Sequence, residues 1–129
     1  MKRSEMREQA FLLTFEGLFS SGEDIDEVIE LYSENVEAEM KNKKYFFTGV
    51  KANKDEFNEI INKYSKSWKV TRLPKVTVAI LYVALYEMKN VEDVADSIAI
   101  NEAVELAKKY ASSADASYIN GILGAVARG

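Results

Sequence analysis

The sequence contains no cysteine and no histidine among its 129 residues. These absences exclude zinc, iron–sulfur and haem sites that depend on protein nitrogen or sulfur ligands, and they exclude catalysis by a thiol or an imidazole. An enzyme would be left with carboxylates, lysine, tyrosine and hydroxyl groups for acid–base chemistry near neutral pH. We therefore expect no metal, no cofactor and no catalytic site.

Proline and glycine are also scarce, with one and six residues respectively. This composition disfavours strand-rich folds with many tight turns and favours long helices. The length, with 47% hydrophobic and 29% charged residues, is that of one ordinary domain covering residues 1–129. The longest apolar run, residues 78–86, is about half of the ~18 to 20 residues that span a bilayer, and Glu16 interrupts the first apolar stretch before it reaches signal-peptide length. These features predict a cytoplasmic protein.

Apolar residues recur along most of the chain at the spacing of three and four that marks one face of a helix. One stretch, residues 76–83, is rich in β-branched residues and is also compatible with a buried strand, but no partner strand of similar strength exists. We therefore predict an all-α domain of six or seven helices. The main helices are expected at about residues 5–19, 25–40, 43–64, 74–88, 96–110 and 114–127.

The net charge of −4 hides a segregated pattern. Residues 23–39 hold eight acids and no base, whereas residues 41–75 hold ten bases and three acids, a local charge of +7. The basic stretch also carries six aromatic residues, which is typical of single-strand nucleic-acid binders but also of a helical core surrounded by lysines. We favour the core interpretation for Tyr45, Phe46, Phe47, Phe57, Tyr64 and Trp68.

Two short motifs are explained better by ordinary features of helices than by a binding site. The acidic residues 23–27 lack the glycine and ligand spacing of a calcium loop and are interpreted as a solvated helix start. Gly121 and Gly124 match the bare GxxG pattern of a nucleic-acid clamp, but no base accompanies them, so close helix packing is favoured. A small basic cluster at the N-terminus could contact phosphates.

Three sequence blocks resemble the NusB transcription antitermination family. They are AILYVALYE at residues 79–87, IAINEAVELAKKY at 98–110 and YINGIL at 118–123. Weaker landmarks are residues 7–10 with Phe15, and Trp68 with Arg72 and Leu73. The resemblance implies a NusB-like fold of two packed three-helix bundles.

The resemblance also implies a function without catalysis. Members of this family pair with ribosomal protein NusE, bind the boxA segment of nascent RNA, and help RNA polymerase read through terminators in ribosomal RNA operons. The RNA contacts that the resemblance implies are Lys2, Arg3, Arg7 and Tyr118. The NusE contacts that it implies are Phe15, Phe19, Arg72, Thr77 and Tyr82.

Some positions depart from the family pattern. An acid is common where Thr77 stands, an arginine where Tyr82 stands, and a basic residue where Ser117 stands, so the partner contacts are expected to be less ionic. The remaining polar positions of the blocks are interpreted as parts of the fold, through a buried amide and a close helix crossing, and not as RNA contacts. These positions are Asn101, Glu102, Asn120 and Gly121.

Other functions remain open from the sequence. A helical scaffold could bind proteins through the basic surface of residues 41–75 without touching RNA. An RNA-targeting module of a methyltransferase is disfavoured, because 129 residues leave no room for a cofactor-binding sheet. A partner-binding apolar face and a homodimer face look alike in sequence, so the oligomeric state is not predicted.

Overall fold

The structure, a computed structural model, describes residues 3–19, 53–66 and 68–129. Within these residues the chain is helical and contains no strand, which confirms the all-α prediction. The elements are α1 (Arg3–Phe19), α4 (Lys54–Tyr64), a single 3₁₀ turn η1 (Val70–Arg72), α5 (Lys75–Asn90), α6 (Asp96–Tyr110) and α7 (Ser113–Arg128).

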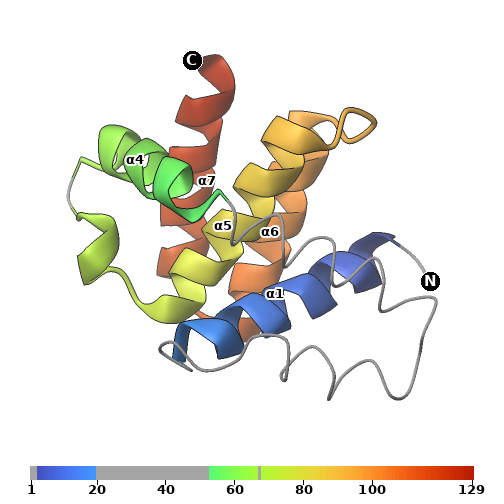
Figure 1. Ribbon diagram of the computed structural model, residues 1–129, viewed down its shortest axis with the longest axis horizontal. Coiled ribbons are helices and arrows are strands. Elements are labelled where there is room, and N and C mark those ends of the chain that lie inside the picture. The colour runs from blue at the N-terminus through green and yellow to red at the C-terminus, as the bar shows by residue number, and fades with distance from the viewer. Residues whose placement is uncertain (1–2, 20–52, 67) are drawn as a thin grey trace.

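Helix α5 lies at the centre of the described fold and contacts α1, α4, α6 and α7 (Figure 1). Every residue from Thr77 to Glu87 is buried, because this helix is apolar on almost all of its faces. Pro74 stands at the N-cap, where its missing N–H is not needed, and its carbonyl accepts a hydrogen bond from the Val78 N–H at 3.1 Å. The β-branched stretch is therefore helical, as predicted.

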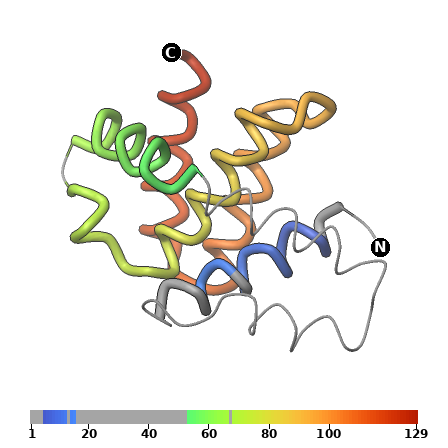
Figure 2. Tube along the Cα trace, viewed as in Figure 1, coloured from blue at the N-terminus to red at the C-terminus, as the bar shows by residue number. Residues whose placement is uncertain are grey.

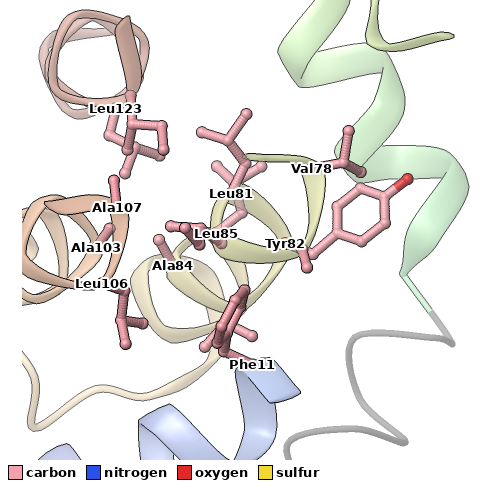
Figure 3. Packing of buried hydrophobic residues seen from close by; sticks show 14 of the residues in the cluster. Phe11, Val78, Leu81, Tyr82, Ala84, Leu85, Ala103, Leu106, Ala107 and Leu123 are labelled. Atoms are coloured by element: carbon pink, nitrogen blue, oxygen red, sulfur yellow. The ribbon is translucent and has the colours of Figure 1, made fainter. Parts of the chain in front are cut away.

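The core forms where α5 meets α6 and α7. Figure 3 shows Leu81 and Leu85 of α5 directed towards Ala107 on α6 and Leu123 on α7, while Phe11 of α1 approaches from another side. Small residues on α6 let the helices approach closely, and all five of these side chains have at most 1% of their surface exposed. Replacing such a leucine by alanine costs about 2–5 kcal/mol, so this junction determines the stability of the fold.

Helix α7 lies between α4 and α6 (Figure 2). Two residues separate it from the end of α6, and the Ser112 hydroxyl oxygen caps it by accepting a hydrogen bond from the Asp115 N–H at 3.1 Å. The short connection makes α6 and α7 antiparallel neighbours, and the three C-terminal helices begin and end within two residues of the predicted positions.

Polar contacts also join α1 to the end of α6. The Lys109 ammonium donates to the Glu8 carboxylate at 2.6 Å, and the Tyr110 hydroxyl donates to the same carboxylate. The hydrogen bond from Lys109 lowers the pKa of Glu8, followed by the one from Tyr110. The Tyr110 ring also packs against Phe11, with ring centroids 5.0 Å apart.

Some predicted elements lie outside the described residues. These are the acidic helix at residues 25–40, with the solvated start at residues 23–27, and residues 43–52. The prediction of one helix over residues 43–64 was wrong, because α4 begins only at Lys54, after the non-helical N-cap Asn53. The arrangement as two three-helix bundles depends partly on the same residues.

Candidate nucleic-acid interface

A basic surface runs from the last turn of α4 to the start of α5. No acid occurs between residues 60 and 86, although the chain as a whole carries a net charge of −4. All five cations of this stretch are exposed, and they recur at every third position. We call residues 63–75 the basic platform, and its cations are Lys63, Lys66, Lys69, Arg72 and Lys75.

Hydrogen bonds to side chains hold the backbone of the basic platform in place. The Val70 N–H donates to Asn62 Oδ1 at 2.8 Å. The Ser65 hydroxyl donates to the carbonyl oxygen of Trp68, and the Trp68 N–H donates back to Ser65 Oγ at 3.3 Å. The backbone of Trp68 is therefore fixed on both sides, while 56% of its residue surface is exposed.

Tyr118 on α7 connects to the same network. Its hydroxyl lies 2.5 Å from Ser65 Oγ. Since the single Ser65 hydroxyl proton is donated to the Trp68 carbonyl, the Tyr118 hydroxyl is the donor in this contact. The half-buried Tyr118 side chain is therefore tied to the loop that presents Trp68.

Trp68, Arg72 and Tyr118 line one open hollow of about 320 Å³. The Asp115 carboxylate also lines it and accepts a hydrogen bond from the Ser112 hydroxyl at 2.7 Å. The remaining lining residues are Leu73, Pro74 and Ala114. The hollow thus combines two aromatic rings, a guanidinium and a hydrogen-bonded carboxylate.

This arrangement brings together residues that sequence reasoning assigned to different partners. Arg72 was expected to contact NusE and Tyr118 to contact RNA, yet both line the same hollow. Trp68 was interpreted as core and is instead exposed, whereas Phe57 is fully buried as expected and Tyr64 is half-buried. The helical spacing that suggested a core position for Trp68 does not apply, because α4 ends at Tyr64.

Tyr45, Phe46 and Phe47 lie outside the described residues. The signal for an exposed Trp68 was the acid-free run of cations at every third position, which does not match the period of an α-helix.

Arg7 does not lie on a surface. Its residue is 3% exposed, and its guanidinium donates from Nε to Glu87 Oε1 and from Nη2 to Glu87 Oε2, the latter at 2.8 Å. Nη1 lies 3.6 Å from Glu102 Oε1. Because these acids come from α5 and α6, the guanidinium joins three helices and presents no free face to a phosphate. We therefore reassign Arg7 from the RNA surface to the core.

Two of the expected NusE contacts are also in the core. Thr77 is 0% exposed, and its Oγ1 has no hydrogen-bond partner in the part of the chain that the structure describes. Tyr82 is 3% exposed, its hydroxyl donates to Asn58 Oδ1 on α4, and burial raises its pKa. Neither side chain offers a surface to a protein partner, so both are reassigned to the packing of α5.

The other expected contacts have different positions. Phe15 is half-buried and stacks on Phe11 at a centroid distance of 6.0 Å. Arg72 is exposed on the basic platform. Lys2 and the side chains of Arg3 and Phe19 lie outside the part of the structure that is described.

The interpretation of the polar block residues as parts of the fold requires correction. Asn101 and Asn120 are exposed and line an open hollow of about 590 Å³ between α6 and α7, so neither is a buried amide. A Cβ added at Gly121 would meet no atom of the described residues within 4 Å, so none of the described helices crosses closely there. At Gly124 a Cβ would meet, among the residues that the structure describes, the end of the Arg128 side chain at 3.3 Å. Of these four residues, only Glu102 is part of the fold as expected, because its Oε1 lies 3.6 Å from Nη1 of the buried Arg7.

Two kinds of feature are absent from the described residues. No group of three or more aspartate or glutamate side chains there is arranged to hold a metal ion. Among the helices that are described, none has both the length and the apolar character to cross a membrane.

Comparison with known proteins gives a consistent result. The sequence model of the NusB family matches residues 4–128. A transcription antitermination protein NusB from Clostridium novyi is 33% identical over 129 residues, covering 96% of each chain. The solved structure of Thermotoga maritima NusB superposes with a TM-score of 0.90 at 27% identity, covering 99% of this chain and 92% of that one.

A solved complex of antitermination factors NusB and NusE with double-stranded RNA shares the fold. Its TM-score is 0.81 at 23% identity, covering 98% of this chain and 96% of the other. The family match extends over nearly the whole chain, and relatives above 30% identity cover almost all of it. This chain belongs to the NusB family.

Proposed function

We propose that this protein is a transcription antitermination factor that binds boxA-type RNA together with ribosomal protein NusE and promotes read-through in ribosomal RNA operons. Membership of the NusB family supports this function, as does the complex of related factors with NusE and RNA. The structural observation that carries the proposal is the acid-free basic platform beside Tyr118. The function needs no catalytic group, and its place of action is the cytoplasm, as part of the RNA polymerase antitermination complex.

On the RNA side, the proposal uses Lys2, Arg3 and Tyr118. The first two supply positive charge from the N-terminal end, and phosphate contacts of this kind give RNA affinity its salt dependence. Tyr118 supplies an aromatic ring at the platform. Arg7 contributes only by holding α1 in place.

On the NusE side, the proposal uses Phe15, Phe19 and Arg72, the last at the border with the RNA surface, where its guanidinium also serves as a phosphate contact. Arg72 is exposed and lines the hollow next to Tyr118, so the two partner surfaces adjoin one another there. Protein partner and RNA are then bound side by side, which agrees with a factor that acts as a complex.

The test is binding of a boxA RNA, with and without NusE, over a series of salt concentrations. Lys2→Gln and Arg3→Gln are expected to weaken binding. Each should also reduce the slope of log affinity against log salt by about 0.7, the value for one phosphate of a single strand that the protein no longer neutralises. Lys89→Gln is the matched control, because it removes one exposed charge from the far end of α5.

Failure of the protein to bind boxA RNA under any condition would refute the proposal. Capture of NusE that survives ribonuclease treatment, without RNA binding, would instead support the alternative of a helical protein-interaction scaffold.

A further inference from the structure

We propose that the hollow between Trp68 and Tyr118 is a slot for one unstacked nucleobase of single-stranded RNA, with the flanking phosphates held by the cations of the basic platform. The inference rests on the proposed RNA-binding function and adds to it a particular binding mode at a particular residue. Trp68 is the stacking surface, and the phosphate contacts are Lys69, which follows it in sequence, and Arg72, which lines the same hollow.

The exposure of Trp68 is the first argument. It is 56% exposed, the highest value among the large apolar residues that the structure describes, although its backbone is fixed by Ser65. A large aromatic ring gains stability when a flat apolar surface covers it, and a fixed backbone reduces the entropy lost on binding. The ring is therefore prepared to stack on a ligand that the free protein lacks.

Charge decides which flat ligand fits. Single-strand binders combine aromatic stacking surfaces with a positively charged groove, and the basic platform supplies both without an acid between residues 60 and 86. Protein interfaces, in contrast, are depleted of lysine, whereas four of the five platform cations are lysines. The surface therefore fits RNA better than a protein partner.

The residues that line the hollow favour a base inside it and disfavour a phosphate there. Asp115 is one of the lining residues, and its carboxylate repels a phosphate but is compatible with the edge of a base that carries N–H donors. Its Ser112 hydrogen bond holds it in position. The base thus enters the hollow while the phosphates remain over Lys69 and Arg72 at the exposed surface.

The size of the hollow agrees with a single base. Its volume of about 320 Å³ lies at the lower end of the range for small-molecule sites, about 300–1,000 Å³. A base must leave its stack to enter, and single-stranded RNA offers such bases at little cost.

Trp68 is the only tryptophan of the chain, so its fluorescence reports directly on the slot. A single-stranded boxA RNA is titrated into the full-length protein, and binding is followed independently by the anisotropy of a labelled RNA. We expect the tryptophan emission to be quenched in parallel with binding. A set of RNAs, each with one abasic nucleotide, should include one that binds more weakly and no longer quenches.

Substitutions provide the second part of the experiment. Trp68→Ala is expected to lower RNA affinity by about 5- to 150-fold, the effect of losing one stacked base, without changing the salt slope. Trp68→Phe should retain most of the affinity. Arg72→Gln and Lys69→Gln should each reduce the salt slope by about 0.7. Ile98→Ala is the matched control, because it removes a 51% exposed side chain from α6 and is expected to leave affinity unchanged.

The outcomes separate this inference from the proposed function. If RNA binds but Trp68 emission does not change, or if Trp68→Ala behaves like Ile98→Ala, the slot is refuted and the RNA-binding function stands. If no RNA binds with or without NusE, both fail. If NusE alone quenches Trp68 and Trp68→Ala loses only NusE, the slot belongs to a protein interface and the inference is overturned. The quenching arm uses the unaltered protein, so it holds even if a variant does not fold.

Discussion

The buried ion pair between Arg7 and Glu87 allows a decisive test of how α1 is held. We consider Glu87→Gln, which keeps the size and shape of the side chain and removes its charge. Glu87 is 0% exposed, and both of its carboxylate oxygens accept hydrogen bonds from the Arg7 guanidinium. After the substitution, one of these acceptors becomes an amide N–H₂ that faces another donor. The guanidinium is left with Glu102, 3.6 Å away and with its side chain 32% exposed, as its remaining acid.

The expected cost follows from this geometry. Removing one partner of a buried pair costs about 3–5 kcal/mol, because the other charge stays desolvated and uncompensated. Since Glu102 remains close to Arg7, we expect the lower end, about 3 kcal/mol. For a domain of this size such a loss lowers Tm by on the order of 10 °C. Arg7→Gln should cost a similar amount, because it leaves the Glu87 charge unpaired in the core.

The assay is urea and thermal unfolding followed by circular dichroism. Glu105→Gln is the control, since this α6 carboxylate is 59% exposed and its loss is expected to cost less than about 0.5 kcal/mol. In the double variant Arg7→Met with Glu87→Leu, much of the stability should return, because well-packed apolar residues often replace a buried pair without net cost. If the single variants unfold like the control, or if Arg7→Gln reduces the salt slope of RNA binding, Arg7 is not the core residue that the structure shows.

Three further outcomes are expected. Glu8→Gln should destabilise the protein at neutral pH: the hydrogen bond from Lys109 lowers the pKa of Glu8, so its contribution is present above the ordinary value of 4.5 and is lost as pH falls through the folded value. Melting curves of both proteins should therefore converge at acidic pH, and a constant difference would contradict the assignment. Thr77→Val should leave the free energy of unfolding unchanged or raise it, because it removes a buried hydroxyl without a partner among the described residues. Undiminished capture of NusE by this variant would support the place of Thr77 in the core. Tyr82→Phe should cost about 0.5–1.5 kcal/mol in urea titrations through the removal of its bond to Asn58, whereas an unchanged midpoint would show that this bond contributes nothing.

The helices of the second half of the chain were predictable because strong local signals mark them. Pro74 marks the start of α5, and the apolar spacing that follows it is regular enough to define α5, α6 and α7 within two residues. The central position of α5 was not predicted, although a helix that is apolar on nearly every face must be covered by neighbours. The choice of a helix over a strand depended on the absence of a partner strand, a property of the whole sequence.

The candidate site was less predictable, because periodicity does not reveal what covers a given face. Arg7 and Glu87 are 80 residues apart, and nothing local shows that their side chains meet. Tyr82 was expected on a partner surface but lies against α4, which packs over this part of α5. Trp68 was misassigned for the opposite reason, since a helical period was extended past the end of α4.

The net charge of −4 does not decide RNA binding, because the cations of this chain differ in whether acids neutralise them. Arg7 is neutralised by acids on α5 and α6, so it releases no counterion when RNA binds. The five platform cations stand in a stretch without acids, and Lys2 and Arg3 add two more. Seven phosphate contacts on a single strand correspond to a salt slope no steeper than about −5. A steeper measured slope would require further cations outside the platform and the N-terminal end, and a slope near zero would show that the platform does not meet phosphate at all.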